Sequence, residues 1–246
     1  MLGILKKRLE PFVKLYSILP LISCFLLNML VYSGTMALCR NWYHHDFTTK
    51  FDLNVPLIPW FMYIYFGCFV FWIVNYIMIG RLEKEHFYRF VTADMMSRII
   101  CGIFFILIPT TNVALRIPIT GDSFSEIMLR FLYQIDQPTN LFPSIHCLVS
   151  WMCFVGIRRQ KDIPIWYRAF SCVFAILVCV STQVTKQHYI VDVFGGIVLA
   201  EIVYFISSKL PIYKVVMRFF DWVNMWFANI LSGKELSIEK QEKDNT

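Results

Sequence analysis

The sequence has little charge. Aspartate, glutamate, lysine and arginine make up 16% of its 246 residues and hydrophobic residues 57%, whereas a soluble domain has roughly 25% charged residues. This shortfall, together with long apolar runs, argues against a soluble protein and indicates a membrane protein. The formal net charge is +6. Because the basic residues stand between apolar runs, they indicate membrane topology and not nucleic-acid binding.

Several other signals are absent. The eight cysteines include no Cys-x-x-Cys pair and no metal-ligand spacing, so we expect neither a structural disulfide nor a metal centre. The first apolar run follows a basic stretch but lacks a small-x-small cleavage site, which favours a membrane helix over a signal peptide. The sequence also lacks the internal repeats that are typical of many transporters.

Six apolar segments predict a polytopic all-α bundle with six transmembrane helices. They cover residues 16–38, 56–79, 96–111, 144–155, 166–184 and 189–207. Eighteen of the 23 lysines and arginines fall on the side of the two termini, and five fall on the other side. Since basic residues concentrate in cytoplasmic loops, we predict a multi-pass protein of the cell membrane with both termini cytoplasmic.

The chain divides into two parts on this basis. Residues 1–210 are predicted to form the six-helix membrane domain. Residues 211–231 mix charged and aromatic side chains and predict an amphipathic helix at the inner interface, followed by a charged, disordered tail up to residue 246. The longest outer loop, residues 112–143, includes an apolar stretch at 127–132 that predicts a short helix, and loops of this length are often functional.

Polar residues cluster twice at the predicted outer ends of the helices. The first cluster, DQPTNLFPSIH, runs from Asp136 to His146, and the second, STQVTKQHYIVD, runs from Ser181 to Asp192. Polar and ionisable groups at the edge of apolar helices cost free energy. Their presence therefore indicates a functional site.

The second cluster contains a candidate nucleophile. His188 and Asp192 are four residues apart, a spacing that places both on one face of a helix. The carboxylate can accept a hydrogen bond from one ring nitrogen, which fixes the tautomer and leaves the other nitrogen free to attack. Gly195 and Gly196 follow and would let a neighbouring helix approach closely.

The first cluster contains a candidate acid. Pro143 suits the first turn of a helix, and Ser144 suits its N-terminus, where a hydroxyl meets free backbone N–H groups. Such a terminus attracts phosphate, so Ser144 is a candidate for binding phosphate, with a plain helix cap as the alternative. His146, just inside the helix, could protonate a leaving oxygen.

Four further residues are candidates for binding phosphate. Arg116 and Lys186 are basic residues on the predicted outer side that could neutralise phosphate oxygens. Asp136 and Asn140 belong to the first cluster. Both residue types also favour turns, so a structural role is the alternative for these two.

The two clusters resemble motifs of a known family. Pro-Ser-x-His, followed by Ser-x6-His-x3-Asp, is similar to the second and third motifs of the type-2 phosphatidic acid phosphatase and vanadium haloperoxidase superfamily. The matching residues are Pro143, Ser144, His146, Ser181, His188 and Asp192. The resemblance covers residues 116–196, and the six-span layout fits the membrane branch.

Some family positions differ in this chain. Ile145 replaces the glycine of the second motif, and Thr182 replaces the arginine of the third. The nearest candidate for the first motif, Lys-x6-Arg-Pro, is Arg116-Ile117-Pro118, with Pro109 at the lysine position. These departures, with Asp-x-Pro-x-Asn-x-Phe-Pro-Ser-x-His and His-Tyr-x-x-Asp, are similar to the inositol phosphorylceramide synthase and sphingomyelin synthase branch.

The resemblance implies a hydrolase for a lipid phosphate, either a phosphomonoester or a diphosphate. His188 would attack phosphorus to form a phosphohistidine while His146 protonates the leaving group, with no metal or other cofactor. The expected partners are the lipid substrate and membrane lipids, not nucleic acid, and the site would lie on the extracytoplasmic side. A lipid head-group phosphotransferase is the alternative. A transporter or an inactive membrane scaffold is a third.

Overall fold

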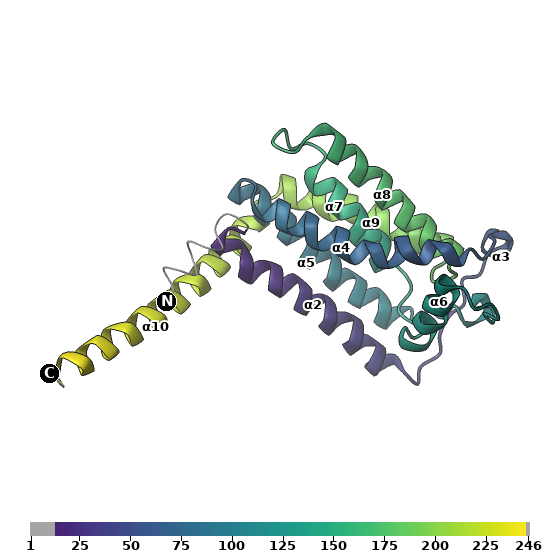
Figure 1. The fold of residues 1–246 in the computed structure, drawn as a ribbon, viewed down its shortest axis with the longest axis horizontal. Coiled ribbons are helices and arrows are strands. Elements are labelled where there is room, and N and C mark those ends of the chain that lie inside the picture. Colours follow the sequence, from purple (N-terminus) through teal and green to yellow (C-terminus); the bar gives the residue numbers. More distant parts are fainter. Residues whose placement is uncertain (1–12, 245–246) are drawn as a thin grey trace.

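The computed structural model describes residues 13–244, which form helices joined by loops, with an isolated bridge between His45 and Thr110 (Figure 1). The predicted all-α class is confirmed. The basic residues at positions 6–8, used in the topology prediction, lie outside the described residues. The helices are α2 (Leu15–Cys39), α3 (Lys50–Asn54), η1 (Pro59–Phe61), α4 (Met62–Gly80), α5 (Lys84–Leu107), η2 (Val113–Leu115), α6 (Phe124–Ile135), α7 (Ile145–Ile157), α8 (Ile165–Val184), α9 (Ile190–Lys209) and α10 (Ile212–Asp244).

Five segments of the described chain are long and apolar enough to cross a membrane. They are Leu15–Cys39, Pro59–Gly80, Lys84–Leu107, Ile165–Val184 and Ile190–Lys209. The fourth predicted span corresponds to α7, which has only 13 residues. At 1.5 Å per residue it is about 20 Å long, shorter than the roughly 30 Å hydrocarbon core of a bilayer. The count of six spans therefore stays a prediction.

The third span begins earlier than predicted. Helix α5 starts at Lys84, so the predicted start at residue 96 is wrong. Charged residues in the first part of the helix depress its hydropathy and conceal it in the sequence. Two of them, Asp94 and Arg98, form an ion pair at 2.7 Å inside the bundle, where their opposite charges neutralise each other away from lipid.

Helix α7 lies in the interior of the bundle and packs most extensively against α8 and α9. Close approach to α9 depends on Gly196. A Cβ atom at this position would lie 2.7 Å from the carbonyl oxygen of Ser144 and 3.0 Å from the backbone nitrogen of Leu148. The prediction that a glycine here allows a neighbouring helix to approach closely is confirmed.

The short helices α3 and α6 gather at one end of the bundle (Figure 1). Helix α6 confirms the short helix predicted in the outer loop and begins at a capping box formed by Ser123 and Glu126. The N-termini of α7 and α9 reach this same end. Loops, helix caps and two helix N-termini therefore come together where the two polar clusters lie.

Helix α10 leaves the opposite end of the bundle and extends away from it (Figure 1). Its base is held by an ion pair between Lys84 and Asp221 at 2.8 Å. The backbone is helical to Asp244, and the disordered charged tail stays a prediction. The division into a membrane domain and an interfacial segment stays a prediction.

Candidate active site

His188 lies in the short connection between α8 and α9. Its backbone N–H donates to the carbonyl of Thr182 at 3.2 Å, and the Gln183 amide donates to its carbonyl at 2.9 Å. Helix α9 begins at Ile190, so His188 precedes the helix instead of lying on it. The carboxylate of Asp192 still reaches back, and its Oδ2 lies 3.2 Å from His188 Nδ1. This contact leaves Nε2 available.

The Asp192 carboxylate is held in place by a second hydrogen bond besides its contact with His188. It is fully buried, and the same Oδ2 accepts the backbone N–H of Tyr189 at 2.9 Å. Burial alone would lower the pKa of His188, but the hydrogen bond and the negative charge of Asp192 outweigh burial and raise that pKa above its ordinary value. The pair therefore stabilises positive charge on the imidazole ring.

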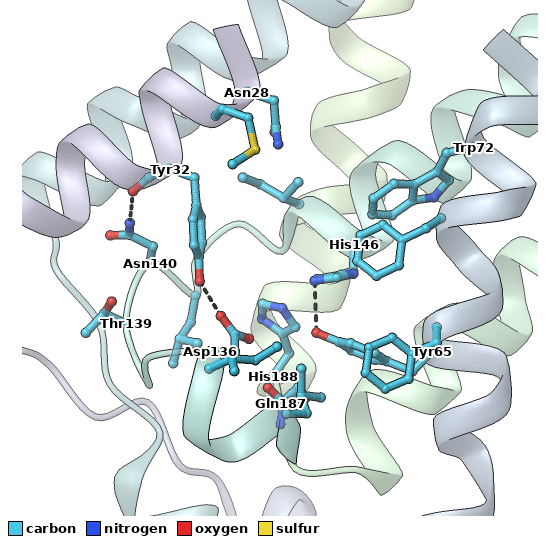
Figure 2. A pocket seen from close by; sticks show the side chains of 17 residues that line it. Asn28, Tyr32, Tyr65, Trp72, Asp136, Thr139, Asn140, His146, Gln187 and His188 are labelled. Carbon is cyan, nitrogen blue, oxygen red and sulfur yellow. Dashed lines mark hydrogen bonds between the residues drawn. The ribbon is translucent and has the colours of Figure 1, made fainter. Parts of the chain in front are cut away.

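His146 faces His188 across a cavity (Figure 2). The centroids of the two rings are 6.0 Å apart. Nε2 of His146 lies 2.9 Å from the hydroxyl of Tyr65 on α4, which fixes the orientation of this ring. Two imidazoles facing one cavity suit a nucleophile and a proton donor acting on the same group.

Ser144 joins the two clusters through its backbone. It is the N-cap of α7, and its Oγ accepts the N–H of Cys147 at 3.3 Å. Its own N–H donates to the carbonyl of Asp192 at 3.1 Å. Ser144 is fully buried and does not line the cavity. The structure therefore supports the helix-cap interpretation, and a phosphate contact by Ser144 stays a prediction.

The cavity between the two histidines has a volume of about 380 Å³. Helices α2, α4 and α6 and the loop after α6 complete its wall, which is largely apolar. Among the described residues, none of the side chains that line it is lysine or arginine. Its lining residues with polar atoms are Asn28, Tyr32, Tyr65, Trp72, Asp136, Thr139, Asn140, His146, Gln187 and His188.

Asp136 and Asn140 both line this cavity, as part of the loop that joins α6 to α7. The Asp136 carboxylate accepts the hydroxyl of Tyr32 at 2.6 Å. Asn140 adopts a left-handed backbone conformation with φ of 56°, and its amide donates to the carbonyl of Tyr32 and to Thr35 Oγ1. These contacts bind the loop to α2 and place one carboxylate beside the histidines.

The family model of the PAP2 superfamily matches residues 37–206, which include both polar clusters. The chain belongs to the PAP2 superfamily. An uncharacterized protein of Methanocaldococcus jannaschii, MJ0662, is 30% identical over 95 residues. The aligned part is 38% of this chain and 38% of that relative, so the chain spans well under two thirds of the relative's length.

The two basic residues predicted for this PAP2 superfamily site do not line the cavity. Arg116 donates to the carbonyls of Tyr133 and Asp136 at 3.2 and 2.8 Å and lies over the Tyr133 ring. Lys186, also in a left-handed conformation, donates to the carbonyls of Asp52 and Val55. Both positive charges stabilise loops around the site by binding main-chain oxygens.

The sequence interpretation missed the contributions of α2 and α4 to this PAP2 superfamily site. Tyr32 and Tyr65 lie in apolar runs, where aromatic residues normally indicate packing or lipid contact. A signal was present at Asn28, an amide in the middle of the first apolar run, because polar residues within membrane helices often mark a functional cavity. Gln187 was overlooked beside the better candidate His188.

Proposed function

We propose that this PAP2 superfamily protein is a lipid phosphate phosphatase of the cell membrane that works through a phosphohistidine on His188. Membership of the superfamily points to phosphatase-type chemistry on phosphate esters. The observation that carries the finer proposal is the buried His188–Asp192 pair facing His146 across one cavity. Nucleophile, orienting carboxylate and acid are then within reach of a single phosphate.

The first step is attack of His188 Nε2 on phosphorus. A nitrogen–phosphorus bond forms, and the bond between phosphorus and the lipid oxygen breaks. Asp192, on Nδ1, stabilises the positive charge that develops on the ring. His146 gives its proton to the departing oxygen. In the absence of substrate the Tyr65 hydroxyl holds His146 Nε2, and the leaving oxygen would take over or share this contact.

The second step releases phosphate. A water molecule attacks phosphorus, the nitrogen–phosphorus bond breaks, and the now neutral His146 accepts the proton that water gives up. His188 returns to its starting state with Nδ1 against Asp192. Neither step draws on a metal or another cofactor, because His188 supplies the nucleophile and His146 carries the proton between the leaving oxygen and water.

The apolar wall of the cavity supports a lipid as substrate. Met29, Phe66, Phe69 and Leu132 line it next to the histidines. Met29 is half-exposed on the outer surface of α2, so the cavity wall continues to the side of the bundle. A soluble phosphate ester has no apolar chain to bury against this surface and would gain no binding free energy from it. A lipid chain would be stabilised by burial there.

Head-group transfer is the second candidate function, and Asp136 favours it. A carboxylate within the cavity repels phosphate but binds hydroxyl groups well. Asp136 has one oxygen on the Tyr32 hydroxyl, and among the described residues no lysine or arginine lines the cavity. The charge of Arg116 acts on Asp136 from outside the cavity, where Arg116 binds the Asp136 carbonyl. An acceptor hydroxyl bound there would replace water in the second step, as in sphingolipid-synthase-type enzymes.

The test is phosphate release by the purified protein in detergent from phosphatidic acid, phosphatidylglycerol phosphate and a polyprenyl diphosphate. We expect release from at least one lipid, and loss of activity by several orders of magnitude in His188→Ala. His44→Ala is the matched control, because His44 lies outside the cavity and its ring hydrogen-bonds to the nearby carbonyl of Trp42. Activity that survives in His188→Ala would contradict the assignment. Lipid-dependent transfer without free phosphate would favour the second candidate.

We also propose that the active site faces the extracytoplasmic side and that both termini are cytoplasmic. The prevalence of basic residues at the end of the bundle opposite the histidines supports this orientation. Single cysteines at Asp122, in the outer loop, and Lys161, between α7 and α8, test it, because both positions are exposed. An impermeant thiol reagent applied to whole cells should label only Asp122→Cys. Labelling of Lys161→Cys alone would reverse the orientation.

A further inference from the structure

A second cavity adjoins the catalytic one. It has a volume of about 460 Å³, lies between α2, α4 and α5, and has mainly apolar walls. Four residues, Asn28, Met29, Phe69 and Trp72, line both cavities. A molecule whose phosphate lies between the histidines can therefore extend into this second space.

An ion pair forms one wall of the second cavity. Arg98 Nη2 lies 2.7 Å from Asp94 Oδ1, and the two side chains are 2% and 1% exposed. The Tyr76 hydroxyl donates to the same carboxylate oxygen at 2.6 Å. A buried ion pair inside a membrane protein is costly and often marks a functional site.

The ion pair has unused hydrogen-bonding groups. Arg98 Nε and Nη1, Asp94 Oδ2 and the neighbouring Asn28 Oδ1 are buried and contact no hydrogen-bonding partner among the described protein groups. Buried donors and acceptors are rarely left in this state. Two charged N–H donors beside an apolar cavity suit an acceptor oxygen carried by an otherwise apolar ligand.

We propose that the second cavity binds the acyl region of the substrate, with Arg98 donating to the carbonyl oxygen of an ester or amide. This inference rests on the proposed lipid phosphate substrate and narrows it to acyl lipids. A polyprenyl chain carries no oxygen, so it would leave the Arg98 donors without a partner, which is costly.

Two side chains of α4 connect the histidines to the ion pair. The ring centroid of Trp72 lies 5.5 Å from that of His146. Tyr76 follows one helical turn later on α4, about 6 Å along the axis, and its hydroxyl contacts Asp94. In a glycerophospholipid the acyl carbonyls are attached to the glycerol that carries the phosphate, a few bonds from phosphorus.

The experiment compares dioctanoyl phosphatidic acid with its dioctyl ether counterpart, which lacks both carbonyls. In the native protein we expect kcat/KM to be about tenfold to a hundredfold higher for the ester, the range for one hydrogen bond to a charged group. In the double variant Asp94→Leu/Arg98→Met the two substrates should be turned over at similar rates. Replacing both charges with apolar groups avoids a lone buried charge and preserves folding.

Ser97→Ala is the matched control. Ser97 lies on the same helix between the two charges, is fully buried and lines neither cavity. It should keep the preference for the ester. Equal rates on both lipids in the native protein, or an ester preference that persists in the double variant, would overturn the proposal.

A binding measurement separates this inference from the proposed phosphatase activity. Dioctanoylglycerol and dioctylglycerol carry no phosphate, and we expect only the ester to raise the melting temperature of the native protein. This effect should be lost in the double variant. Selective stabilisation in a protein inactive on all lipid phosphates would support the acyl site and contradict the phosphatase. Absence of selective stabilisation would contradict the acyl site alone.

Discussion

Gly196→Ala tests how closely α7 and α9 must approach for the two histidines to work together. The added Cβ would lie 2.7 Å from the Ser144 carbonyl oxygen, whereas ordinary van der Waals contact begins at 3.4 Å. The helices must therefore separate by about 0.7 Å, because the opposing atoms belong to the backbone and have no rotamer to change. Ser144 caps the helix that carries His146, so the separation moves one histidine relative to the other.

Two effects of this substitution are expected. Overpacking of this kind lowers the free energy of unfolding by about 1–3 kcal/mol. A misplacement approaching 1 Å lowers the turnover of a positioned reaction by roughly tenfold to a hundredfold. Phosphate release in detergent and thermal unfolding of the same preparation measure both quantities.

Gly34→Ala is the control for this experiment. Gly34 also lies within an apolar helix, α2, but a Cβ there would have no neighbour within 4 Å. It should leave activity unchanged and raise stability by about 0.5–1 kcal/mol. If Gly196→Ala matches Gly34→Ala in turnover and stability, close contact of α7 and α9 does not control the site and the reasoning is wrong.

Three further predictions concern the site and its support. Because Asp192 raises the pKa of His188 above its ordinary value of 6.5, the neutral nucleophile is lost as pH falls through that raised pKa. The pKa of the acid limb in a plot of kcat/KM against pH should therefore be above 6.5, and Asp192→Asn should lower it. If the limb stays in place in Asp192→Asn, His188 is not the group that causes it. Tyr65→Phe removes the hydrogen bond to His146 and should lower kcat about threefold to tenfold with KM unchanged, whereas a changed KM alone would assign Tyr65 to substrate binding. Lys186→Met should lower the free energy of unfolding by about 1–3 kcal/mol and leave KM unchanged; a large rise in KM would instead support phosphate binding by Lys186.

The sequence was most informative where chemistry depends on local spacing. His188 and Asp192 are four residues apart, and the loop before α9 holds them in contact at 3.2 Å. His146 follows Ser144 on a helix whose start could be read from proline and serine. Helix-terminal motifs of this kind specify their own geometry, so the catalytic candidates could be placed without knowledge of the rest of the fold.

The sequence was least informative about charged side chains, because their identity does not reveal their direction. Arg116 and Lys186 were predicted to bind phosphate, but both bind main-chain carbonyls at the edge of the site. The start of α5 was also missed. Lys84, Glu85 and Arg89 lower the hydropathy of the start of this helix. Only the folded bundle shows that the next two charges, Asp94 and Arg98, neutralise each other.

The backbone hydrogen bond from Ser144 to Asp192 has a consequence for how substrate preference can diverge. It joins the two histidine-bearing segments through main-chain atoms alone, so no substitution other than proline at position 144 removes the joining groups. The cavity walls that would meet the proposed lipid come largely from α2 and α4, which are outside this connection. Related chains can therefore exchange the residues of those two helices and acquire new lipids while inheriting the reactive centre intact.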